Sequence, residues 1–235
     1  MHDNKAQDFI KELEKHRNEQ DVEKMKRFFK SSDPDTLCLG LQMRTVFQIA
    51  KQFMDMSLPE IEKVLESPYY EVRMGAVSIM DYQAKKRKIS EEERKSLFDL
   101  YLRRHDRINN WDFVDRSAPS VIGTFLLDKP KDILYTLARS SNMWERRTAI
   151  VSTHAFIKKG EINHTFRIAE ILIHDPEELI QKAVGSWIRE AGKQDETMLK
   201  RFLNEYAPTM PRVTLRYAVE KLNKETRDFY LSMGK

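Results

Sequence analysis

Hydrophobic residues recur at helical spacing along the chain, and short polar or proline-containing stretches interrupt them. Residues 5–30 read as one or two amphipathic helices, with apolar positions at Phe9, Ile10, Leu13, Val22, Met25 and Phe28-Phe29. Residues 31–35 form a break. A further helical pattern covers residues 43–54, with an apolar face at Val46, Phe47, Ile49, Ala50 and Phe53. Ser57 is placed to cap a helix over residues 60–66, which Ser67-Pro68 ends.

Beyond this point the pattern repeats itself. Small and apolar pairs open the second half of each unit, at Ala76-Val77, Ala149-Ile150, Ala183-Val184 and Ala218-Val219. The first step is 73 residues and the next two are 34 and 35, so one unit is missing, and Phe113-Val114 falls in the gap. Repeats of this length, with two helices each, are typical of an α-solenoid. We therefore predict a single all-α domain over residues 1–235.

The stretch from Asn109 to Pro119 carries the candidate chemistry. Trp111 and Asp115 are four residues apart, which places both side chains on one face of a helix. An indole face and a carboxylate together suit a cation. Pro119 either kinks a helix that runs through this stretch or starts a new helix that Ser117 caps. The simpler alternative for the pair is an exposed aspartate and a core tryptophan.

The repeat phasing connects this stretch with later residues. Trp111 and Asp115 fall on the inner helix of their repeat, Arg147 holds the corresponding place one repeat later, and Ser186-Trp187 the place after that. Inner helices of a solenoid face a common concave surface. We therefore expect Trp111, Asp115, Arg147 and Trp187 to converge on one groove.

Composition supports helices and permits a nucleic-acid partner. The 235 residues include only seven glycines and eight prolines, fewer turn residues than a sheet protein needs. Lys and Arg number 41 against 37 Asp and Glu, a mildly basic balance of +4. The single cysteine, Cys38, excludes an internal disulfide, fits a reducing intracellular setting and is expected to be buried. Neither a membrane-spanning run nor metal-ligand spacing occurs among the residues, so we expect no membrane and no metal partner.

Basic residues gather near the helix ends of successive repeats. The runs are residues 85–88, Arg103-Arg104 with Arg107, Arg146-Arg147 and Lys158-Lys159. Each run alone is a solvated surface, but at repeat spacing they together predict a basic concave groove that follows a phosphate backbone.

Four segments resemble a known family. They are Trp111–Asp115, Asn142–Ala149, Ile180–Glu190 and Pro211–Ala218, and they resemble the DNA alkylation repair family of the AlkD type, glycosylases built from HEAT-like repeats. The resemblance implies a right-handed α-solenoid, and as partner a duplex DNA that carries an alkylated purine. It further implies excision of positively charged N3- or N7-alkylpurines without a cofactor. We expect a monomer that is located in the cytoplasm, in the same compartment as the DNA.

The resemblance also implies roles for individual residues. Asp115 matches the family's catalytic aspartate, and Trp111 and Arg147 match residues that contact the substrate. The family's second site tryptophan directly follows the motif glycine; here Ser186 holds that position and Trp187 comes one residue later, about 100° away on a helix. Arg189 matches an arginine that contacts the DNA backbone. Lys182 and Arg146 are basic residues that recur just before or beside the small and apolar pairs, and we predict the same role for them.

Two other functions are consistent with the repeats. A HEAT-like scaffold that binds a protein partner explains the periodicity. It does not explain why Trp111, Asp115 and Arg147 occupy corresponding positions of successive repeats. A non-catalytic DNA-binding solenoid explains the basic runs and is compatible with Ser186. Trp144 is expected in the core, and Asp112 is expected to be a helix N-terminal charge rather than a second catalytic carboxylate.

Overall fold

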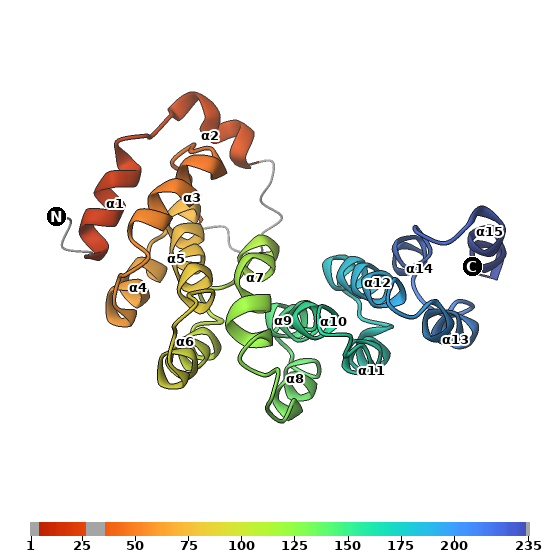
Figure 1. Ribbon diagram of the computed structural model, residues 1–235. Coiled ribbons are helices and arrows are strands. Elements are labelled where there is room, and N and C mark those ends of the chain that lie inside the picture. The colour runs from red at the N-terminus through yellow and green to blue at the C-terminus, as the bar shows by residue number, and fades with distance from the viewer. Residues whose placement is uncertain (1–4, 27–35, 234–235) are drawn as a thin grey trace. The chain divides into compact units, whose positions relative to one another are not determined.

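The computed structural model describes residues 5–26 and 36–233, and all regular secondary structure in these ranges is helical (Figure 1). A single isolated bridge there joins Leu37 and Tyr69. The all-α prediction is thus confirmed. The chain divides into two compact units, Met1–Phe125 and Leu126–Lys235, which are described separately. The single-domain assignment stays a prediction.

The first unit stacks its helices in two rows. Its elements are α1 (Ala6–Glu14), α2 (Glu19–Lys26), α3 (Met43–Gln52), α4 (Leu58–Leu65), α5 (Tyr70–Ala84), α6 (Glu91–Arg103), α7 (Trp111–Ala118) and the π-helix η1 (Pro119–Gly123). Helices α3, α5 and α7 pack in succession, while α4 packs against α5 and α6 packs against η1 (Figure 1). The predicted break at residues 31–35 and the pair Phe28-Phe29 lie outside the described residues.

The second unit repeats this arrangement. Its elements are α8 (Asp132–Leu137), α9 (Met143–Ser152), α10 (His154–Ile157), α11 (Asn163–Leu172), α12 (Glu178–Gly192), α13 (Glu196–Tyr206), α14 (Arg212–Ala218) and α15 (Lys224–Met233). Helices α9, α12 and α14 pack in succession, with α8 against α9 and both α11 and α13 against α12 (Figure 1).

The predicted repeat phasing is confirmed by burial. The pairs of α5, α9 and α12 are buried, as are Ala218 at the end of α14 and Val219 after it. Phe113 and Val114, which the phasing placed in the missing unit, are fully buried on α7. Trp144 and Cys38 are buried as expected, at 5% and 6% exposure. Ser57 stands at the N-cap position of α4, but its side chain makes no cap hydrogen bond.

A buried carboxylate ties the first unit together. Glu71 on α5 is fully buried, and it accepts hydrogen bonds from the backbone N–H groups of Leu39, Gly40 and Leu41 at 2.9, 2.8 and 3.2 Å. Gly40 has a φ of 79°, a conformation that favours glycine, and this turns successive N–H groups toward the carboxylate. The segment before α3 is thereby fixed against α5.

Candidate active site on α7

Helix α7 presents Trp111 and Asp115 together. Asn110 caps the helix, its side-chain oxygen accepting a hydrogen bond from the Trp111 N–H at 2.8 Å. The buried face of α7 carries Phe113, Val114, Ser117 and Ala118. Trp111 and Asp115 lie one turn apart on the half-buried side, so neither belongs to the fully buried core. The predicted one-face placement of the pair is confirmed.

The helix changes its geometry directly after Asp115. Pro119 continues α7 without a break, and the π-helix Pro119–Gly123 follows, in which the Thr124 N–H bonds to the Pro119 carbonyl at 3.0 Å. Proline has no N–H to donate to the Asp115 carbonyl, and the wider π turn accommodates this defect. Ser117 does not cap a new helix, because its hydroxyl donates within the helix to the Phe113 carbonyl at 2.7 Å. Of the two alternatives, the continuous, distorted helix is therefore correct. Single π turns are frequent at functional sites.

Arg116 fixes the C-terminal half of α7. Its guanidinium lies over the rings of Phe47 and Tyr82, 4.7 and 4.9 Å from their centroids. It also pairs with the buried carboxylate of Asp81 at 3.2 Å. The Ser120 hydroxyl donates to the same carboxylate at 2.6 Å. The segment that carries Asp115 is thus held by cation–π and charge-assisted contacts to α3 and α5. The sequence pattern did not indicate these contacts.

The first turn of α7 is anchored by Tyr70. The Tyr70 hydroxyl donates to Asp112 Oδ2, and its ring stacks on Phe113 with centroids 5.1 Å apart. Arg73 donates to Asn109 Oδ1 at 2.8 Å from the same side. Asp112 lies in the first helical turn, as predicted for a helix N-terminal charge. Burial raises its pKa to about 6, although the Tyr70 hydrogen bond acts in the opposite direction and the Asp115 charge adds to the rise.

The raised pKa of Asp112 predicts a specific pH dependence of stability. A carboxyl whose folded pKa exceeds its ordinary value of 3.8 contributes stability that is present below pH 4 and is lost as the pH rises through about 6. Asp112→Asn removes this titration and keeps the shape. Relative to the parent, the variant should therefore gain unfolding free energy between pH 4 and 7, by at most about 3 kcal/mol. Urea unfolding of both proteins at several pH values measures this, and parallel curves would contradict it.

In the second unit, Arg147 and Arg146 lie next to one another with different surroundings. Arg147 is buried at 7% exposure, and its Nη1 donates to the Leu179 carbonyl at 2.7 Å. Arg146 binds Asp175 through two nitrogens, at 2.6 and 3.1 Å, and donates to the carbonyls of Ser140 and Ser141. These contacts give Arg146 a structural role, and its role at the DNA backbone stays a prediction.

Helix α12 carries three of the predicted contact residues, namely Trp187, Lys182 and Arg189. Trp187 is half-buried, and its ring lies tilted against that of His154, with ring centroids 4.9 Å apart and an interplanar angle of 35°. Lys182 pairs with Glu178 at 2.7 Å, and Arg189 pairs with Glu190 at 3.1 Å and with Glu220. The predicted meeting of Trp111 and Asp115 with Arg147 and Trp187 in one groove involves both units and stays a prediction.

The basic run of Arg103-Arg104 with Arg107 is bound by residues of its own unit. Arg104 is buried at 7% exposure among the carboxylates of Glu62, Glu66 and Asp106. Arg103 also pairs with Glu62, and Arg107 donates to the carbonyls at the end of α4. This run therefore joins α6 and the loop after it to α4.

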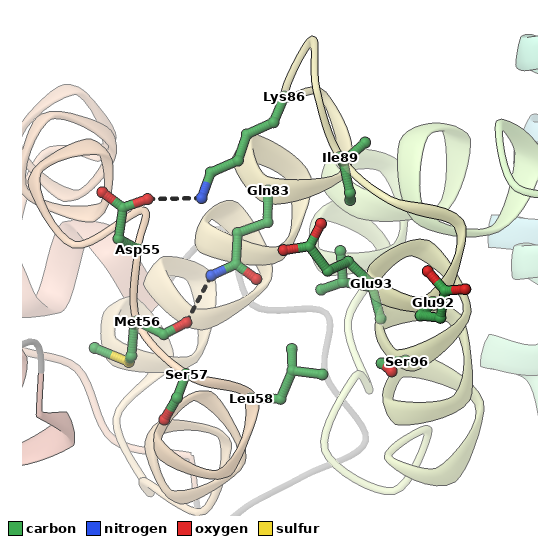
Figure 2. A pocket seen from close by; sticks show the side chains of 11 residues that line it. Asp55, Met56, Ser57, Leu58, Gln83, Lys86, Ile89, Glu92, Glu93 and Ser96 are labelled. Carbon is green, nitrogen blue, oxygen red and sulfur yellow. Dashed lines mark hydrogen bonds and ion pairs between the residues drawn. The ribbon is translucent and has the colours of Figure 1, made fainter.

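The run at residues 85–88 borders a hollow of the first unit. The hollow lies where the α3–α4 loop, the end of α5 and the start of α6 meet (Figure 2). Across it Lys86 pairs with Asp55 at 2.6 Å, and the Gln83 amide donates to the Met56 carbonyl at 2.6 Å. Glu92 and Glu93 complete its rim. With three carboxylates and one ammonium group, this rim does not suit a phosphate.

The fold and the α7 site are those of a helical-repeat protein with a carboxylate and an indole one turn apart on the same helix. The model of the DNA alkylation repair enzyme family matches residues 9–222, and the chain belongs to that family. A solved structure with a similar fold is that of a predicted DNA alkylation repair enzyme from Enterococcus faecalis, with 19% identity and a TM-score of 0.72. The match covers 89% of this chain and 98% of that one. No curated protein matches the chain.

Family membership gives the chain a role in DNA alkylation repair, with DNA as its partner. Over the described residues, no group of three or more His, Cys, Asp or Glu side chains is arranged to hold a metal ion. Within the same ranges, the helices are too short or too polar to span a bilayer.

Proposed function

We propose that this protein is a DNA glycosylase that excises positively charged N3- or N7-alkylpurines from duplex DNA. The observation that carries the proposal is the placement of Trp111 and Asp115 one turn apart on the half-buried side of α7. The capped first turn, the Arg116 contacts and the π-helix hold this pair in a fixed geometry. Preorganised charge of this kind is the usual source of transition-state stabilisation.

The chemistry needs few groups. A cationic alkylpurine departs as a neutral base, so no general acid has to protonate the leaving group, and one carboxylate suffices where other glycosidases use two. In this proposal Asp115 stabilises the positive charge that develops on the sugar and orients the attacking water. The Trp111 ring packs against the sugar and the cationic base. Asp112, bound to Tyr70, stays outside the reaction.

The proposed activity is tested by incubating the purified protein with methylated duplex DNA and measuring the release of 7-methylguanine. Release above that from DNA alone supports the glycosylase. Duplex binding without release supports the second candidate, a non-catalytic DNA-binding protein. Two observations favour that candidate: Ser186 holds the position of the family's second site tryptophan, and the Trp187 ring lies against His154.

Binding itself should depend steeply on salt. A protein that neutralises several phosphates releases their counterions, so the logarithm of its duplex affinity falls linearly with the logarithm of salt concentration. We expect a slope of several units for this basic chain. Titration of a fluorescent duplex at increasing NaCl concentrations measures it. A flat dependence would contradict direct binding of the phosphate backbone by this chain and would favour the protein-binding scaffold.

A further inference from the structure

Helices α12 and α14 approach each other closely at Gly185. A Cβ atom at Gly185 would lie 2.5 Å from the Thr214 carbonyl oxygen and 2.6 Å from Cβ of Tyr217, so only glycine fits. The Thr214 hydroxyl donates to the Gln181 carbonyl across the same contact, at 3.1 Å. Close packing against α14 therefore requires a glycine at this position of the segment Ile180–Glu190, which resembles the family. The same contact fixes the distance between the side chains of α12 and those of α14.

A hollow of about 400 Å³ lies between these two helices. Its lining is formed by Glu178, Lys182, Val213, Arg216, Tyr217 and Glu220. Arg216 is exposed and makes no ion pair or hydrogen bond with any residue that the structure describes. Tyr217 is 36% exposed, one of three large hydrophobic side chains at the surface within residues 5–26 and 36–233. An exposed guanidinium without an ion pair among the described residues and an exposed aromatic ring thus line the same hollow.

The carboxylates of this lining do not offset Arg216. Glu220 is bound by Arg189 and by Lys221, the latter at 2.8 Å, and these contacts lower its pKa. Glu178 pairs with Lys182 one turn away on α12, and a surface pair of this kind is weak enough for a phosphate to displace. Counted with Arg189, Lys221 and the Glu190 that also pairs with Arg189, the hollow and its immediate partners hold four cations against three carboxylates.

We propose that this hollow binds a phosphodiester group of the DNA, held by Arg216 and Lys182, with Tyr217 packed against the neighbouring sugar or base. A guanidinium offers two parallel donors to phosphate oxygens, and lysine adds a point charge. An aromatic ring beside these cations is typical of surfaces that follow a nucleic-acid strand. The proposal rests on the proposed function, because it takes DNA as the partner, and it adds Arg216 and Tyr217 to the residues that contact it.

The test compares Arg216→Gln with a matched control, Arg201→Gln. Arg201 is likewise exposed and without an ion pair among the described residues, but it lies on α13, in the other row of helices. Arg216→Gln should lower the slope of log affinity against log salt for an undamaged duplex by about 0.9, the loss of one phosphate contact. Arg201→Gln should leave the slope unchanged. Tyr217→Ala keeps the Cβ that packs on Gly185 and should weaken binding at an unchanged slope.

The outcomes separate this inference from the proposed function. The inference alone is overturned if the parent protein binds duplex and releases 7-methylguanine while Arg216→Gln shows the same salt slope as the parent. Equal reductions for Arg216→Gln and Arg201→Gln overturn it too, because they reflect net charge and not a site. Parent protein that does not bind duplex overturns both. Far-ultraviolet circular dichroism of each variant confirms that the helices are intact.

Discussion

Asp115→Asn should release 7-methylguanine from methylated duplex DNA about 10²–10³-fold more slowly than the parent protein. The substitution keeps the size of the side chain and removes only its charge. Because Asp115 is half-buried on a helix held by Arg116 and the π turn, the charge is both fixed and partly shielded from water. A loss of this size corresponds to about 3–4 kcal/mol of transition-state stabilisation. The measurement is the single-turnover rate of base release.

The matched control for this experiment is Asp112→Asn. Asp112 lies on the same helix, but its carboxylate is bound to Tyr70, so this variant should keep base release close to the parental rate at neutral pH. Asp115→Asn should bind duplex at least as tightly as the parent, since a negative charge near the phosphates is gone. Trp111→Ala should weaken both binding and release. A parental rate for Asp115→Asn would show that another group is the catalytic carboxylate, and a slow Asp112→Asn would point to Asp112.

The sequence pattern predicted the repeat and its phase well. Periodic burial produces a periodic sequence, so the small and apolar pairs at Ala76, Ala149 and Ala183 identify helices α5, α9 and α12, and the gap in their spacing located α7. For the same reason the shared face of Trp111 and Asp115 was predictable, because it depends only on helical geometry within one turn. A feature that depends only on the geometry of one helix, such as which residues share a face, can be predicted from the sequence of that helix.

The supports of the site were not predictable in this way. Arg116 finds Asp81 and two aromatic rings on other helices, and Tyr70 reaches Asp112 across 42 residues of sequence. A sequence shows where charges occur but not which partners the fold brings to them. The run at Arg103 and Arg104 illustrates this, since both side chains are bound to Glu62 of α4, and Arg104 also to Glu66 directly after that helix. Partner choice depends on tertiary packing, which periodicity does not encode.

Glu71 is the clearest example of a partner that the sequence does not show, and Glu71→Ala should destabilise the protein by about 3–9 kcal/mol, the sum over three unpaired donors. The substitution leaves the backbone N–H groups of Leu39, Gly40 and Leu41 without their acceptor. Each buried donor left unpaired costs about 1–3 kcal/mol. This is a large part of the stability of an ordinary domain. Urea unfolding followed by circular dichroism measures the change.

Two further variants show whether the hydrogen bonds account for the effect. Glu92→Ala removes an exposed glutamate of α6 in the same unit and should change the unfolding free energy by less than about 0.5 kcal/mol. Glu71→Gln keeps one acceptor oxygen but turns an amide N–H₂ toward a backbone donor, so its stability should fall between those of the parent and Glu71→Ala. If Glu71→Ala unfolds at the same urea concentration as Glu92→Ala, the segment before α3 is held by apolar packing and not by the carboxylate. If Glu71→Gln is as stable as the parent, the negative charge of Glu71 contributes nothing to the three bonds.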